Sequence, residues 1–118
     1  MTKEPEREVE LEQKILESCD KLFPDVLDFT EEMVKQYSVL NQEQGVLEVV
    51  ERQLSDLNLS PIRVPIDVER LGSHPMFAPV PWGYDHKYNL VSVLNPGASG
   101  KSLVFNGHLD VVPATPFE

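Results

Sequence analysis

A histidine and an aspartate stand two positions apart near the end of this 118-residue sequence, in Gly107-His108-Leu109-Asp110. In extended backbone, residues i and i+2 project from the same side, so this spacing can present an imidazole and a carboxylate together. A histidine that binds a metal ion through one ring nitrogen usually hydrogen-bonds through the other, often to a carboxylate. The residue types and their spacing therefore suit a metal site.

The pair directly follows an apolar run, Leu103-Val104-Phe105, which predicts a strand over about 101–106. Consecutive apolar residues are typical of a sheet that is covered on both faces. In α/β sheets, ligands bind beyond the carboxyl ends of the strands. The same two residues are also compatible with a hydrogen-bonded loop histidine and a turn aspartate, and the spacing alone leaves both interpretations open.

The elements that would position this pair begin with helices, over about 6–57. Apolar residues recur at helical spacing over 6–22, from Pro24 to about Gln36, and over about 43–57. Pro24 suits the first turn of a new helix but also kinks an existing one, so residues 6–37 form either two helices or one kinked helix. Asn58 is a plausible stop for the last helix.

Strands are predicted next, over about 61–67 and 88–94, before the strand at 101–106. Their alternating or continuous apolar residues are separated by a proline- and glycine-rich loop over 68–87 and a turn over 95–100. His74 and His86, near Asp85, lie in or next to the long loop, and we expect both to be exposed loop histidines. Gly100-Lys101-Ser102 leads into a strand rather than a helix, which argues against a phosphate-binding loop.

Charge and composition exclude several classes of partner. The net charge is -10, and residues 1–58 hold 15 acidic and 6 basic residues. This acidity argues against nucleic acid or an anionic membrane, because phosphates are bound by Lys and Arg. No apolar run approaches the ~20 residues of a membrane span, the charged N-terminus is unlike a signal peptide, and Cys19 is the single cysteine. We expect a cytoplasmic protein.

The complete string Gly107-His108-Leu109-Asp110-Val111-Val112-Pro113 resembles the first metal motif of a family of zinc-dependent deacylases and exopeptidases. That family includes acetylornithine deacetylase, succinyl-diaminopimelate desuccinylase, aminoacylase and glutamate carboxypeptidase. The likeness extends more loosely upstream, over about 25–114. Helix 25–37, the turn after it and helix 43–57 resemble the family's opening helix pair, and Lys87-Tyr88-Asn89-Leu90-Val91 resembles the strand before the metal strand.

The resemblance implies an α/β fold: the N-terminal portion of a mixed-sheet, zinc-exopeptidase-like catalytic domain. Residues 1–24 would be an extra N-terminal helix and 25–118 the start of the domain, and the family's inserted dimerisation domain is absent. The implied enzyme is a metal-dependent hydrolase of amide bonds in N-acyl amino acids or small peptides. His108 would be a metal ligand and Asp110 the catalytic-site carboxylate that orients it. Two zinc (or cobalt) ions would activate water, and the complete enzyme would be a homodimer.

The family's other ligands and its general base lie downstream of this motif. We therefore expect these 118 residues to be a fragment that is inactive alone and binds no zinc tightly. An alternative of another class remains: a small acidic interaction module without enzyme activity, in which the metal motif is a relic.

Overall fold

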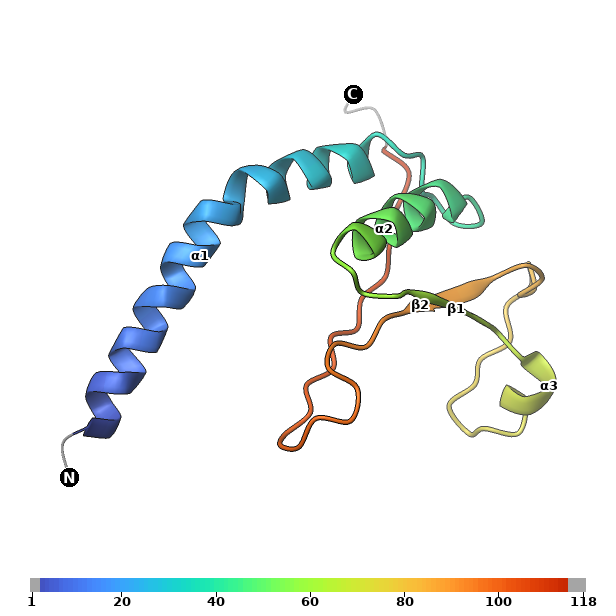
Figure 1. The fold of residues 1–118 in the computed structure, drawn as a ribbon. Coiled ribbons are helices and arrows are strands. Elements are labelled where there is room, and N and C mark those ends of the chain that lie inside the picture. Colours follow the sequence, from blue (N-terminus) through green and yellow to red (C-terminus); the bar gives the residue numbers. More distant parts are fainter. Residues whose placement is uncertain (1–2, 115–118) are drawn as a thin grey trace. The chain divides into compact units, whose positions relative to one another are not determined.

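The computed structural model describes the backbone of residues 3–114 and the side chains of residues 7–114. The described elements follow in the order α1 (Lys3–Val34), α2 (Gln44–Asp56), β1 (Ile62–Pro65), α3 (Val68–Leu71) and β2 (Tyr88–Val91) (Figure 1). Contacts divide the chain into two units, Met1–Lys35 and Gln36–Glu118. In its described part the first unit consists of α1 and Lys35. The second unit contains α2, β1, α3 and β2.

α1 is one helix that continues through Pro24, so the two patterns before residue 37 belong to a single element. Its ribbon is bent (Figure 1), and Pro24 inside it lacks an N–H donor and crowds the preceding turn, which favours bending. Exposed ion pairs one turn apart, Lys14–Glu10 at 2.7 Å and Lys35–Glu31 at 2.8 Å, add modest support. Within residues 3–114, no helix combines the length and the apolar character that crossing a membrane requires.

α2 confirms the helix that the sequence predicts at 43–57, and it carries the buried core of the second unit. Val46 and Val49 are only 3% and 5% exposed, and they lie on one face because they are three residues apart. The helix ends at Asp56, and Asn58, two residues further on, has a left-handed backbone (φ 59°). There the N–H groups of Asn58 and Leu59 donate to carbonyls in the last turn, so the predicted stop is confirmed.

β1 and β2 confirm two of the three predicted strands, although each is shorter than predicted. They pair antiparallel, with Ile62 opposite Val91 and Pro65 opposite Tyr88. Pro65 is the last residue of its strand, where the missing N–H disrupts the hydrogen bonds between the strands least. The segment between the strands, predicted as a loop, contains the four-residue helix α3, whose first turn is capped by Asp67. The described part is thus a mixed α and β structure.

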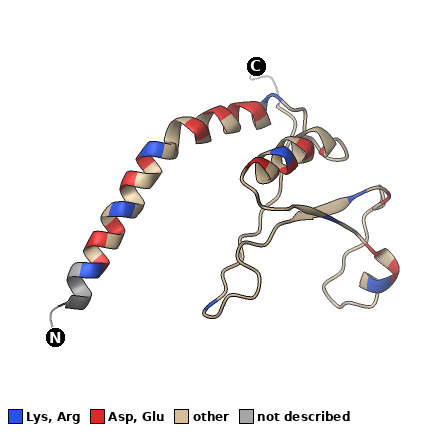
Figure 2. Ribbon diagram, viewed as in Figure 1, with Lys and Arg blue, Asp and Glu red and all other residues tan. Residues whose placement is uncertain are grey.

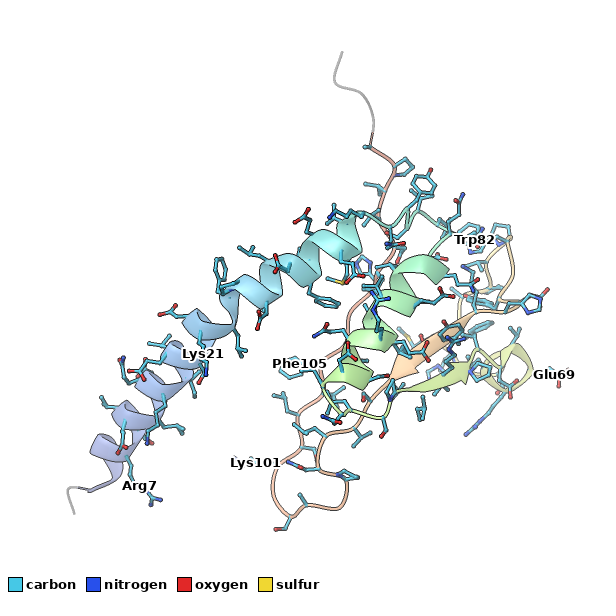
Figure 3. All side chains as sticks on the ribbon, turned by 45° about the horizontal axis from the view of Figure 1, so that its top comes forward. Arg7, Lys21, Glu69, Trp82, Lys101 and Phe105 are labelled. Carbon is cyan, nitrogen blue, oxygen red and sulfur yellow. The ribbon has the colours of Figure 1, made fainter. Side chains whose placement is uncertain are left out.

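The strand predicted over 101–106 is wrong. Residues 101–110 have no regular secondary structure, and they follow the open excursion after β2 (Figure 1). Leu103, Val104 and Phe105 are 77%, 83% and 91% exposed, and Figure 3 labels Phe105 on this segment. An apolar run becomes a strand only when another strand takes up its N–H and C=O groups. Within residues 3–114, the ladder of β2 is with β1, and no ladder reaches 101–106.

Candidate functional site

Backbone pairing with the turn before α2 anchors the segment that carries His108 and Asp110. The Val111 N–H donates to the Ser38 carbonyl at 2.9 Å, and Val39 and Val111 form an isolated parallel bridge. Ser38 is 5% exposed, so this acceptor lies in a protected position. The site is therefore tied to the turn before α2 and not, as the sequence predicts, to the end of a strand.

The structure brings the two predicted site residues together. His108 Nδ1 lies 3.2 Å from Asp110 Oδ1 and 3.0 Å from the Asp110 carbonyl oxygen. Both neighbours are acceptors, so in the neutral ring they favour the tautomer with its proton on Nδ1. Nε2 then presents its lone pair away from Asp110. This is the arrangement in which a histidine binds a metal ion through one nitrogen and is oriented through the other.

The pair is open to water. The His108 side chain is 83% exposed and the Asp110 side chain is 47% exposed. In such surroundings the contact between them is screened and worth little to stability. Gly107 has an ordinary φ, and an added Cβ would meet open space, so its local backbone does not require glycine. The exposure of His108 leaves room for further groups to approach Nε2.

A zinc ion takes four tetrahedral ligands, and at least three of them come from protein. Within the described residues, no group of three or more His, Cys, Asp or Glu side chains is gathered as a metal site would require. His108 fits the role of one ligand and Asp110 that of its orienting carboxylate. These two residues alone do not complete such a site within residues 7–114, and any further donors would have to come from elsewhere.

The other histidines have local surroundings of their own. His74 Nδ1 accepts a hydrogen bond from the Met76 N–H at 3.2 Å, so this ring shapes its own turn. His86 adopts a left-handed backbone (φ 62°). It lines an open surface hollow of about 410 Å³ together with Arg63, Lys87 and Tyr88. Both histidines are exposed, as predicted.

Two ion pairs that the sequence did not reveal hold the sheet against α2. Lys87 Nζ lies 2.9 Å from Glu43 Oε2, 44 positions away, and both side chains are at most a quarter exposed. Arg63 binds the Glu51 carboxylate through Nε and Nη2, and its guanidinium also lies 4.9 Å from the centre of the Tyr88 ring. Contacts between residues so far apart leave no spacing signal in a single sequence.

These contacts lower the pKa values of the two carboxyl groups, Glu43 and Glu51. Partial burial raises the pKa of Glu43, but hydrogen bonds from Lys87 and from the backbone N–H of Asn41 outweigh it, so the pKa is lowered overall. The hydrogen bonds from Arg63 lower the pKa of Glu51, and Glu51 in turn raises the pKa of Arg63. Neither pair belongs to the His108 site. The two ion pairs hold α2 and the strand pair together, and the chain continues from β2 to the His108 site.

No protein-family model, curated protein or solved structure matches the chain. The features that point to a function are the His108–Asp110 geometry and the motif in which the pair stands.

Proposed function

We propose that this chain is the N-terminal portion of a metal-dependent amide hydrolase, a deacylase or exopeptidase that acts on N-acyl amino acids or small peptides. One observation carries the proposal: His108 Nδ1 is paired with Asp110 at 3.2 Å while Nε2 remains available. The pair stands inside Gly-His-Leu-Asp-Val-Val-Pro, which resembles the first metal motif of the zinc-dependent deacylases and exopeptidases. Geometry and motif support the same roles for the two residues.

In this proposal His108 binds metal through Nε2, and Asp110 fixes the ring orientation and makes the imidazole a stronger donor. Val111 sets where both side chains lie, because its N–H is bound to the Ser38 carbonyl. Two zinc or cobalt ions, when bound in the complete enzyme, would polarise the scissile carbonyl and lower the pKa of the attacking water. We further propose a cytoplasmic homodimer, with the remaining ligands and the general base supplied from outside residues 1–118.

The exposure of the pair is consistent with these roles. A His108 side chain that is 83% exposed can accept neighbouring ligands without any rearrangement of the described core. The apolar run before it, with Phe105 91% exposed, would be covered by the same added structure. Burial of that run would also lower the local dielectric around the metal site, which strengthens electrostatic catalysis.

The test uses the protein encoded by the complete reading frame that contains this sequence, loaded with zinc. Release of free amine from N-acetyl amino acids and dipeptides is the readout. We expect hydrolysis that His108→Ala abolishes, and that Asp110→Asn reduces about 10- to 100-fold, as for other partners of metal-bound histidines. His74→Ala is the matched control and should retain wild-type turnover, because that ring shapes only its own turn. A folded, zinc-loaded protein without hydrolysis would contradict the proposal, and so would a His108→Ala variant as active as the wild type.

A further inference from the structure

Asn106 and Gly107, the two residues before His108, form an Asn-Gly pair in an open stretch of chain. Both residues are exposed, and residues 101–110 have no regular secondary structure. The described part of the chain provides no hydrogen-bond partner for the Asn106 side chain or for the Gly107 N–H. An added Cβ at Gly107 would meet open space. The side-chain amide of Asn106 and the backbone N–H that follows it are therefore unhindered.

An unhindered Asn-Gly pair can react with itself. The Gly107 nitrogen attacks the side-chain carbonyl carbon of Asn106, Cγ, and loses its proton as the new N–Cγ bond closes a succinimide ring. The bond between Cγ and Nδ2 breaks, and ammonia leaves with that proton. Glycine favours this step, because it has no Cβ to crowd the attacking nitrogen and its backbone reaches conformations that other residues avoid.

Water then opens the succinimide ring in one of two ways. Attack at Cγ gives aspartate. Attack at the main-chain carbonyl carbon gives isoaspartate, in which the chain continues through Cγ and the main-chain carboxylate is free. No atom is oxidised or reduced in either step, and water is the only co-reactant. Both products carry a carboxylate where the chain had a neutral amide.

The other four asparagines of the chain lack this combination of features. Asn95 precedes a proline, which has no N–H to lose. The N–H groups that follow Asn41 and Asn58 donate to backbone carbonyls at 2.8 and 2.9 Å. Asn89 lies inside β2, where pairing with β1 holds the backbone extended. Ring closure at the last three positions requires local opening of the chain first.

We propose that Asn106 is a modification site of this chain, at which spontaneous deamidation proceeds through a succinimide formed with Gly107. The site needs no enzyme and no cofactor, since both reacting groups belong to neighbouring residues and the solvent supplies the water. The proposal depends on the surroundings of these two residues, and it stands whether or not the chain is part of a hydrolase.

Deamidation changes the charge beside the candidate metal ligand. Residues 92–109 contain no Asp or Glu, and Lys101 is their one Lys or Arg (Figure 2). A carboxylate at position 106 stands two positions before His108, and Asp110 stands two positions after it. Isoaspartate also adds a methylene group to the main chain ahead of His108, whereas the spacing from His108 to Asp110 is unchanged. The modified chain thus offers the imidazole a second neighbouring carboxylate.

The experiment incubates the full 118-residue chain in warm, mildly alkaline buffer. Peptide mapping by mass spectrometry follows the exchange of NH2 for OH at each asparagine, and an isoaspartate-specific methyltransferase detects isoaspartate. We expect Asn106 to deamidate at least about tenfold faster than Asn58, whose following N–H is hydrogen-bonded and belongs to a leucine. Isoaspartate should accumulate at position 106 together with aspartate.

Two substitutions of Gly107 test the route. Gly107→Ala should slow deamidation of Asn106 at least about tenfold, because its Cβ crowds the nitrogen but meets no other part of the described chain. Gly107→Pro should abolish the reaction, because proline has no N–H. Ser102→Ala is the matched control on the same exposed segment, and it should leave the rate within about twofold of wild type.

Denaturant separates the contribution of the fold from that of the sequence. In guanidinium chloride the rate at Asn106 should change by less than about twofold, because the site is already open, whereas the rate at Asn58 should rise. A strong acceleration at Asn106 would overturn the proposal by showing that the folded chain protects it. Equal rates at Asn106 and Asn58, an unchanged rate in Gly107→Ala, or aspartate without isoaspartate would each overturn it as well.

Discussion

His108 Nδ1 lies 3.2 Å from Asp110 Oδ1, and both residues belong to a segment without helix or strand. Their proximity is a local property, because residues two apart in extended backbone face the same side. The described part of the chain contributes an anchor, the hydrogen bond from the Val111 N–H to the Ser38 carbonyl. The pair can therefore be tested in the 118-residue chain before any catalytic assay.

Replacing Asp110 by Ala should change the tautomer of His108. In the native chain the neutral ring should carry its proton on Nδ1, since both acceptors near that atom belong to Asp110. Without the carboxylate, the Nε2-protonated form should gain population. Long-range ¹H–¹⁵N NMR at alkaline pH distinguishes the two forms. His74, whose Nδ1 accepts from the Met76 N–H, is the internal control and should stay Nε2-protonated in both proteins. A His108 ring that is Nε2-protonated in the native chain would contradict this prediction.

Zinc should bind the 118-residue chain only weakly. One imidazole and one carboxylate directed at that imidazole are fewer donors than the three or four that hold zinc in proteins. Calorimetric titration should show no stoichiometric site of sub-micromolar affinity. His108→Ala should alter the heats only slightly. One or two tight sites would show that donors outside the described geometry complete a centre within this chain.

The Val111 amide should exchange with solvent at least about tenfold more slowly than the Val104 amide. Val111 donates at 2.9 Å to a carbonyl of the buried Ser38, whereas Val104 is 83% exposed on the open segment. Hydrogen exchange followed by NMR measures both amides in one sample. Val111→Ala keeps the backbone donor and should keep the protection. Exchange at similar rates for the two amides would mean that the anchor does not persist in solution.

Glu43→Gln should destabilise the second unit by about 1 to 2 kcal/mol at neutral pH. The substitution removes the negative charge that is paired with Lys87, and both of these side chains are largely shielded from water. The pKa of Glu43 is lowered in the folded chain. A lowered pKa gives stability that is full above the ordinary carboxyl pKa of 4.5 and is lost as the pH falls through the folded value. The difference between wild type and variant should therefore shrink below about pH 4.5.

Urea unfolding followed by the fluorescence of Trp82, the single tryptophan, measures this difference at several pH values. Glu69→Gln is the matched control, because Glu69 is an exposed acid on the short helix α3, and it should change the free energy of unfolding by less than about 0.5 kcal/mol. A Glu43→Gln effect that is the same at pH 7 and below pH 4 would show that the ion pair is not its cause.

The helices and the strand pair were predictable because their signals are local. α2 was visible in the spacing of Val46 and Val49, and its end in Asn58, whose side chain tolerates the left-handed backbone. Pro24 misled only in part: it is compatible with either a helix start or a bend, and tertiary context decides between them.

The run Leu103–Phe105 shows where local signals fail. Its apolar residues have the composition of a buried strand, but burial and pairing depend on partners that are absent from the described residues. The candidate site was predictable in its residues, His108 and Asp110, and in their proximity. Its anchor to Ser38 was not, since that contact joins segments more than 70 positions apart and leaves no trace in spacing.

The exposed run 103–105 also has a consequence for biosynthesis. When this stretch leaves the ribosome, none of the described residues made before it pairs with it as a strand, so three consecutive apolar side chains face water. Segments of this kind are the ones that holdase chaperones recognise and that intermolecular strand pairing captures when chaperones are scarce. The fate of the newly made chain would therefore depend on how quickly this short run is covered.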